Sequence, residues 1–455
     1  MSLAPKSLQL SSQAVWPVDR IKDHASKIGS GVTPSGGATS YLDEGIPLLR
    51  SQNVHFDGLR LGDVAYISEQ THAEMSGTQL TDRDVLLNIT GASIGRCTFV
   101  PDGFGEGNVN QHVCIIRTTA RLHYKFLTYC LAGPWGQDQV LSSFTGASRQ
   151  GLGQRDLGEI QVPLPPLPEQ QRIAAYLDST CAAIDAAVAA KRRQIETLDA
   201  LRKSVAHQVL SEGLRPGLPL KDSGIESIGV IPAHWDVKQL RYACEVNYGI
   251  TLQLEKGQGP GDGVRILTVS NITIDGNLDL EDEYYIDAAQ LTSADYLQQG
   301  DLLFNWRNGS QYHVGKTAFF DLEGEFAHVS FLLRIRCGRH MDPFFLRSYL
   351  GVLKDAGFFS GAKDKVNKTF NSTELKRLQV VIPPRDEQKE VCLEIQQRAR
   401  KVDDVEISIQ AQIEILTAYR KSLIHECVTG QRRVTEADLQ RAGGAQSVCA
   451  VRQSS

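Results

Sequence analysis

The chain has 455 residues, a formal net charge of −5 and a pI near 6.1, so it has no global attraction for polyanions, and nucleic-acid contacts must come from local patches. Its length is enough for at least two independent cores. The nine cysteines form no C-x-x-C pair and no Cys/His cluster at zinc spacing, and no stretch approaches the ~20 apolar residues of a membrane span. These features favour a soluble, cytoplasmic protein without metal.

The first predicted domain covers residues 1–164. Short runs rich in β-branched and apolar residues, DVLLNIT (84–90) and HVCIIRT (112–118), are typical of strands, and HYKFLTYCLAG (123–133) is typical of a short helix. The sequence therefore predicts an α+β domain.

Two polar loops of this domain are candidate DNA contacts. They are NITGASIGR (88–96) and SSFTGASRQGLGQRDL (142–157). Cationic side chains bind phosphates, and amide side chains can read base edges. The candidate residues are Ser93, Arg96, Arg149, Gln150, Gln154 and Arg155. An ordinary solvated charged loop is the alternative for 142–157, and a glycine hairpin for 88–96.

A long helix is predicted over residues 165–212. It follows a proline-rich stop, and the stretch from Glu169 to Leu210 contains no Gly or Pro. A linker, 213–234, leads to a second α+β domain over 235–384. Its predicted strands are DLLFNW, TAFFDL and VSFLLRIRC, and its predicted helix is PFFLRSYLGVLKDAG. Its two polar loops offer the candidates Arg307, Asn308, Gln311, Tyr312, Lys316, Lys363, Lys365, Asn367, Lys368 and Asn371.

A second long helix is predicted over 385–430, followed by a tail, 431–455, that we expect to be flexible. Both helices carry an apolar heptad seam sustained over five heptads, which is typical of a coiled coil. The central seam residues are Leu177, Ile184, Val188, Lys191, Ile195 and Leu198 in the first helix and Ile395, Val402, Glu406, Ile409, Ile413 and Leu416 in the second.

The two charges in the seam, Lys191 and Glu406, indicate how the helices pair. An antiparallel arrangement in which facing residue numbers sum to 597 places these charges opposite each other. A parallel arrangement would leave both buried and unpaired. We therefore expect an antiparallel pair with this register, the alternative being that each helix packs on its own domain or on a second copy of the chain.

The second half of the chain repeats the first at a shift of 218 residues. The match is gapless between 162–211 and 380–429, which pairs the prolines and the Glu-Gln that open each helix. Upstream the match is weaker but collinear, and it pairs His112 with His328. A period this long indicates a duplicated domain.

Motifs for catalysis are absent. GSQYHVGKT has five residues between its glycines where a phosphate loop has four, and a strand-like run follows it. Other glycine clusters lack the strand, turn and helix order of a dinucleotide site. No cluster of two acids and a lysine stands out, and the double prolines lack the Asn or Asp of an amino-methyltransferase motif.

The chain resembles the DNA-specificity subunits of type I restriction-modification systems in three features. They are the helix openings PLPPLPEQQRIAAYLD and IPPRDEQ, the two-fold repeat, and the segment DSGIESIGVIPAHWDV (222–237). The resemblance covers the chain up to about Val434. One departure is that the first domain lacks the full opening segment found before Trp235.

The resemblance implies two tandem target-recognition domains separated by an antiparallel coiled coil, which read a bipartite, asymmetric DNA target. It also implies docking of methyltransferase subunits, typically two, and of a restriction subunit. Those partners supply S-adenosylmethionine, ATP and Mg, and this chain binds no cofactor and catalyses nothing. A free-standing methyltransferase or nuclease, or a coiled-coil scaffold without DNA binding, are the alternatives.

Overall fold

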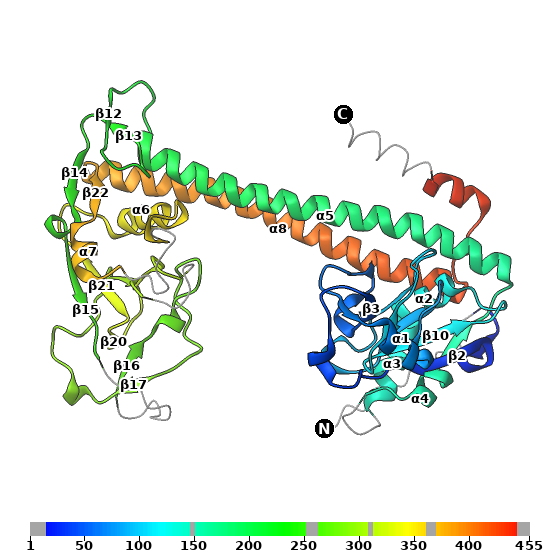
Figure 1. Ribbon diagram of the computed structural model, residues 1–455. Coiled ribbons are helices and arrows are strands. Elements are labelled where there is room, and N and C mark those ends of the chain that lie inside the picture. Colours follow the sequence, from blue (N-terminus) through cyan, green and yellow to red (C-terminus); the bar gives the residue numbers. More distant parts are fainter. Residues whose placement is uncertain (1–14, 146–150, 252–262, 308–312, 361–369, 444–455) are drawn as a thin grey trace, which may run out of the picture. The chain divides into compact units, whose positions relative to one another are not determined.

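The computed structural model describes residues 15–145, 151–251, 263–307, 313–360 and 370–443 (Figure 1). The chain divides into two compact units. Unit 1 is Met1–Arg192 with Gln410–Ser455, and unit 2 is Arg193–Ile409. Each long helix belongs partly to each unit.

Unit 1 is built on a four-stranded antiparallel sheet in the order β2-β10-β7-β8. The strands are β2 (Ala25–Ser30), β10 (Val113–Thr118), β7 (Val85–Asn88) and β8 (Cys97–Phe99). β7 and the first four residues of β10 are buried on both faces, which explains why they read as continuous apolar runs. The two predicted strands are thus the central strands of the sheet.

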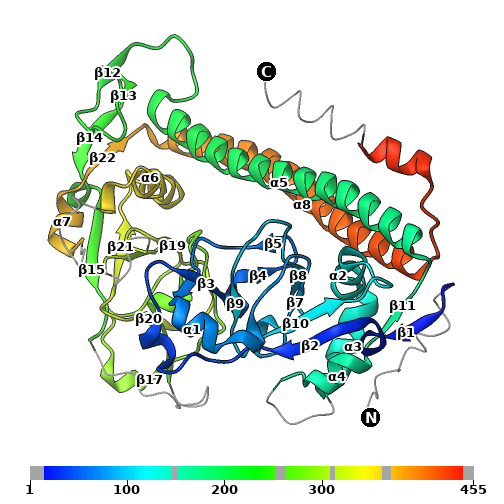
Figure 2. The ribbon, with the colours of Figure 1, turned by 45° about the vertical axis from the view of Figure 1, so that its right-hand side comes forward.

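Each face of this sheet packs against a different layer. Helix α2 (Tyr124–Ala132) packs on one face together with the long helices, in a core that includes Phe126, Leu177 and Leu423 (Figure 2). A smaller sheet covers the other face through Leu49 and Val109. Its order is β6 (Ala65–Ile67), β3 (Ile46–Leu49) and β9 (Asn108–Val109).

Unit 2 repeats this topology strand for strand. The larger sheet has the order β15 (Cys244–Tyr248), β21 (Leu332–Cys337), β18 (Leu302–Asn305) and β19 (Thr317–Phe319). The smaller sheet has the order β17 (Tyr285–Ile286), β16 (Val264–Leu267) and β20 (Phe326–His328). The predicted helix is present as α6 (Pro343–Asp355). The duplicated α+β domain predicted from the sequence is confirmed.

The strand registers correct one predicted correspondence. Asn88 pairs with Val113 as Asn305 pairs with Leu332, so the residue before Val113, His112, is equivalent to Phe331. His328 pairs with Leu267 in the way that Val109 pairs with Leu49. The predicted equivalence of His112 and His328 is therefore wrong by three residues.

The remaining strands and short helices frame these sheets. Two-stranded ladders join the start of each domain to the segment before its long helix: β1 (Val18–Arg20) with β11 (Gln161–Pro163), and β14 (Asp236–Gln239) with β22 (Gln379–Ile382). The other elements are β4 (Val54–His55), β5 (Gly58–Leu59), α1 (Glu69–Glu74), α3 (Pro134–Thr145), α4 (Gln154–Glu159) and α7 (Ser372–Arg377).

The long helices are α5 (Leu167–Glu212) and α8 (Arg385–Thr429). A buried glutamine fixes the start of each. In unit 2, the Gln388 side chain donates to the carbonyls of His340 (2.9 Å) and Pro383 (2.8 Å) and accepts from the Asp342 amide (2.7 Å). Gln170 makes the same three contacts in unit 1, with Arg121, Pro165 and His123. These contacts explain why the Glu-Gln pair recurs after each double proline.

The helices pair antiparallel within each unit. In unit 2, Arg202 of α5 contacts Asp403, while Arg215 beyond its end contacts Glu390. In unit 1, Asp185 contacts Arg420, while the later Lys191 contacts Gln412. Seam residues such as Ile184, Ile409 and Ile413 are buried, so the seam and the orientation are both confirmed.

The predicted register, however, is wrong. The contacting pairs have residue numbers that sum to 603, 605 or 608, about one heptad or more above 597. Lys191 donates to Gln412, and Glu406 accepts from Arg202 at 3.1 Å. A one-heptad slip keeps the same seam facing inward, so the apolar pattern could not distinguish the two registers. Both charges reach polar partners at the edge of the seam instead of each other.

Among the described residues, one helix, α5, contains an 18-residue window of mean hydropathy 1.3, which is long and apolar enough to cross a membrane by length and composition alone. A core helix that packs inside a protein passes the same test, and a third of this window is buried.

Two further expectations need correction. The predicted linker 213–234 contains the hairpin β12 (Leu220–Asp222) and β13 (Val230–Pro232), and its Ile225, Ile228 and Ile231 join the core of unit 2. Residues 431–443 of the predicted flexible tail pack on unit 1 through Val434 and Leu439.

Candidate nucleic-acid interface

Four loops of unit 1 converge at one end of its larger sheet. The loop after β7 accepts a backbone hydrogen bond from the loop before α4, from Leu152 N to Ile89 O (2.8 Å). Ile89 N donates to the carbonyl of His112, in the loop before β10 (3.0 Å). Gln154 donates to the hydroxyl of Ser30, at the end of β2 (3.2 Å). We call this set of loops the loop edge of unit 1.

Unit 2 has a loop edge built in the same way. Phe370 N, before α7, donates to Trp306 O, after β18 (2.9 Å). The Trp306 indole donates to Ser330 O, before β21 (2.7 Å). Ser372 N donates to the hydroxyl of Tyr248, at the end of β15 (3.1 Å). In each unit, the structure thus joins the two loops that the sequence singled out separately.

The described candidate residues differ in their accessibility. Gln154, Arg155 and Arg307 are exposed, and Ser93 and Arg96 are half-buried in the turn after β7. Asn371 is the N-cap of α7, and its side-chain oxygen accepts from Thr373 N and Glu374 N. Nine candidates lie outside the described residues: Arg149, Gln150, Asn308, Gln311, Tyr312, Lys363, Lys365, Asn367 and Lys368.

Lys316 is not on an open rim. Its side chain is only 6% exposed, and its ammonium donates to Ile272 O (3.1 Å). It therefore faces the interior side of its loop, where it lines a cleft discussed below.

A chain of hydrogen bonds orients an exposed amide at the loop edge of unit 1. The Gln111 amide nitrogen lies 3.0 Å from His112 Nε2, and His112 Nδ1 lies 2.6 Å from Thr90 Oγ1. Because the amide nitrogen can only donate, Nε2 accepts and Nδ1 carries the ring proton toward Thr90. The sequence analysis paired His112 with His328 but did not select it as a contact residue. In the structure, His112 fixes the direction in which Gln111 presents its carbonyl oxygen and second N–H, which make no hydrogen bond to the described residues.

The equivalent position in unit 2 has different chemistry. Arg307 stands where unit 1 has Thr90, and its guanidinium lies 5.9 Å from the ring centroid of Phe331, the counterpart of His112. Phe331 and Tyr248 are 48% and 46% exposed, and Tyr248 packs edge-on against Trp306 at 5.5 Å. Sequence reasoning missed both aromatic residues, because an apolar residue beside a strand is usually in the core.

The described residues contain no group of three or more His, Cys, Asp or Glu side chains that could hold a metal ion. Burial raises the pKa of the Cys114, Cys392 and Cys427 thiols to about 12. These thiols are therefore protonated at neutral pH and unsuited to nucleophilic chemistry. The loop edges carry side chains suited to binding.

Comparisons with known proteins agree with this arrangement. The type I restriction modification DNA specificity domain matches residues 45–197. A putative type I restriction enzyme MjaX specificity subunit from Methanocaldococcus jannaschii is 32% identical over 209 residues. The match covers 44% of this chain and 47% of that protein, so the chain spans about half the length of this relative. The EcoKI specificity subunit from Escherichia coli is 21% identical over 406 residues, covering 87% of this chain and 84% of that one.

Solved structures share the fold. A chain from a study of complex assembly and conformational transition of the type I R-M system has a TM-score of 0.68 at 15% identity, covering 94% of this chain and 99% of that one. The HsdS subunit from Thermoanaerobacter tengcongensis has a TM-score of 0.53 at 16% identity, covering 92% and 97%. The matching domain, the relatives along most of the chain and the duplicated fold all point the same way: the chain is similar to the DNA-specificity subunits of type I restriction-modification systems.

Proposed function

We propose that this chain is the sequence-specific DNA-binding subunit of a type I restriction-modification complex, and that its two domains read two unlike halves of a bipartite, asymmetric target. The observation that carries the proposal is the pair of loop edges. They have the same backbone framework and different side chains at equivalent positions. A duplicated reader with altered reading residues is suited to two different half-sites.

In unit 1, Gln111 is the residue proposed to contact a base. Its carbonyl oxygen and remaining N–H form the acceptor and donor pair that matches adenine N6 and N7 in the major groove. The contact through His112 to Thr90 holds that amide in one orientation, which reduces the entropy lost on binding.

In unit 2, Arg307 is the proposed base contact. A guanidinium held over an aromatic ring by a cation–π contact can still point its donors outward, and these match guanine O6 and N7 in a bidentate arrangement. Exposed Tyr248 and Phe331 add apolar surface beside it. Phosphate contacts from Arg155 and the other loop cations would position both edges.

We further propose that the chain itself catalyses neither methyl transfer nor cleavage. Methyltransferase subunits, typically two, would supply S-adenosylmethionine chemistry, and restriction subunits would supply ATP- and Mg-dependent steps in the cytoplasm. The exposed apolar residues of α8, among them Ile407 and Ile415 at 68% and 67% exposure, offer surface for such partners. The half-sites are expected roughly one helical turn apart, about 34 Å.

The test uses the complete chain with its methyltransferase and maps methylated positions on a random DNA library. Gln111→Ala should relax one half-site at an adenine, and Arg307→Ala should relax the other at a guanine, each by about 1–3 kcal/mol of base discrimination. Arg241→Ala is the matched control. It removes another exposed arginine over an aromatic ring, with its guanidinium carbon 5.0 Å from the ring centroid of Tyr242, away from the loop edge. This variant should leave the motif unchanged. An unaltered motif in both loop-edge variants would contradict the assignment of these residues.

A further inference from the structure

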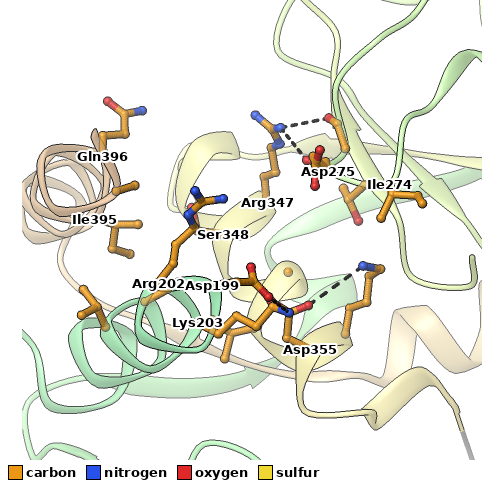
Figure 3. Close-up of a pocket in the computed structure, with 18 of the residues that line it drawn as sticks. Asp199, Arg202, Lys203, Ile274, Asp275, Arg347, Ser348, Asp355, Ile395 and Gln396 are labelled. Atoms are coloured by element: carbon orange, nitrogen blue, oxygen red, sulfur yellow. Dashed lines mark hydrogen bonds and ion pairs between the residues drawn. The ribbon is translucent and has the colours of Figure 1, made fainter. Parts of the chain in front are cut away.

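Unit 2 contains a cleft of about 630 Å³ between its domain and the two long helices. Figure 3 shows Arg202 and Lys203 of α5 and Ile395 and Gln396 of α8 on one side, with Arg347 and Ser348 of α6 and the segment around Asp275 facing them. Six cationic side chains and three carboxylates line the cleft, in a chain that is acidic overall. The cations are Arg202, Lys203, Lys316, Arg347, Lys354 and Arg398.

Arg347 is held by neutral groups. Its guanidinium donates to Gly276 O (2.9 Å), to Asn277 Oδ1 (3.1 Å) and to Asp275 O (3.4 Å), all through one nitrogen. Among the described residues, no carboxylate lies within 4.0 Å of it. The fold does not require an arginine here, because the equivalent position of α2 in unit 1 is Thr128.

Lys316 is the second cation without a carboxylate partner among the described residues. It has one hydrogen bond, to Ile272 O, which leaves two ammonium N–H groups. Burial lowers the pKa of Lys316, and the nearby charge of Lys354 lowers it further. Lys354 has only Asp355, at 4.0 Å. The ammonium groups of Lys316 and Lys354 thus lie close enough to repel each other, and Lys316 is largely shielded from water.

The cations contributed by the long helices are already paired. Lys203 bonds to Asp199 (2.7 Å), Arg398 bonds to Glu394 (2.6 Å), and Arg202 contacts Asp403 and Glu406. Among the described residues, the cations of the cleft that form no ion pair within 4.0 Å are therefore Lys316 and Arg347, on the domain side. Lys354 has the 4.0 Å contact with Asp355, and the charge of Asp321 acts on Arg347 from a greater distance.

We propose that this cleft binds a phosphate group through Arg347, Lys316 and Lys354. Partly buried cations without counter-ions are costly, and an anion among them removes that cost. Phosphate oxygens accept charge-assisted hydrogen bonds from both guanidinium and ammonium groups. The phosphate could belong to a DNA backbone or to a free phosphate compound, since the chemistry recognised is the same.

The experiment measures inorganic phosphate binding to the full chain by isothermal titration calorimetry, without DNA or partner subunits. Wild type should bind saturably. Arg347→Thr, which installs the residue of the sister domain, should weaken binding at least about ten-fold, as expected when a charge-assisted hydrogen bond is lost. Arg241→Thr makes the same change of charge outside the cleft and should bind as wild type does. Lys316→Met provides a second variant, and circular dichroism checks that each variant is folded.

Equal phosphate binding by Arg347→Thr and Arg241→Thr would overturn the proposal, as would no saturable binding by wild type. Two outcomes support it and identify the source of the phosphate. If a DNA duplex displaces phosphate, and Arg347→Thr reduces the salt dependence of DNA binding by about one phosphate contact, the backbone is the ligand. If DNA and phosphate bind together, the ligand is a free phosphate compound. Because the titration involves no base reading, its failure would leave the proposed function untouched.

Discussion

Replacing Gln388 by alanine should destabilise unit 2 strongly, because this buried side chain joins the start of α8 to the segment before α6. The change removes three hydrogen bonds of 2.7–2.9 Å and leaves the Asp342 amide and two carbonyls without their partner. Gln388 is fully buried. A buried polar group left unpaired costs about 1–3 kcal/mol, so the three together should cost roughly 3–5 kcal/mol if the site relaxes only partly.

The assay is urea-dependent hydrogen exchange, read by mass spectrometry on peptides covering 340–345 and 385–395. Exchange there should become faster and the local unfolding midpoint should fall, while unit 1 peptides stay unchanged. Gln397→Ala, at an exposed position of the same helix, is the matched control and should change stability by less than about 0.5 kcal/mol. If the two alanine variants were equally stable, the inference that this glutamine fixes the helix start would be refuted.

Two further predictions follow from the register and from a buried histidine. In a double-mutant cycle, Arg202 and Glu406 should show a coupling energy of about 0.5–1 kcal/mol, which is small because both side chains are about 40% exposed. Lys191 and Glu406 should show no coupling, because Lys191 bonds to Gln412 instead. A measurable coupling energy between Lys191 and Glu406 would restore the register predicted from the sequence. Burial first, and then the charge of Arg334, lowers the pKa of His328 from 6.5 to about 4. The unfolded chain therefore binds more protons between these pH values, and stability is lost as pH falls from about 6.5 toward 4. The variant His328→Val carries the residue found at the equivalent position of unit 1, Val109. Between pH 7.5 and pH 5, it should lose about 2 kcal/mol less free energy of unfolding than the wild type, as measured by chemical unfolding. An unchanged pH dependence would show that His328 is not responsible.

The sequence predicted the architecture well because its signals are periodic or repeated. The heptad seam, the strand runs and the recurring Pro-Pro and Glu-Gln pairs each reflect a local requirement of the backbone. The helix register was wrong because a seam of period seven matches itself after a shift of one heptad, and only polar contacts such as Arg202 with Glu406 break that degeneracy.

The candidate site was predicted in outline and missed in detail. Two loops per domain were selected by their polar residues, and the structure joins them through hydrogen bonds such as Leu152 to Ile89. Sequence reasoning had no means of placing Gln111 and His112 beside Thr90, because their proximity depends on the pairing of β7 with β10. Sequence reasoning also placed Lys316 on an exposed rim, because the burial of a loop lysine depends on tertiary packing that the sequence does not show.

The central claim is that two equivalent loop edges with different side chains read two unlike half-sites. Single-molecule sequencing of DNA methylated by this chain together with its methyltransferase tests it most directly. We expect a motif of two different short half-sites separated by an unread spacer that brings them about one helical turn apart. A contiguous motif, or two identical half-sites arranged as a palindrome, would contradict the account.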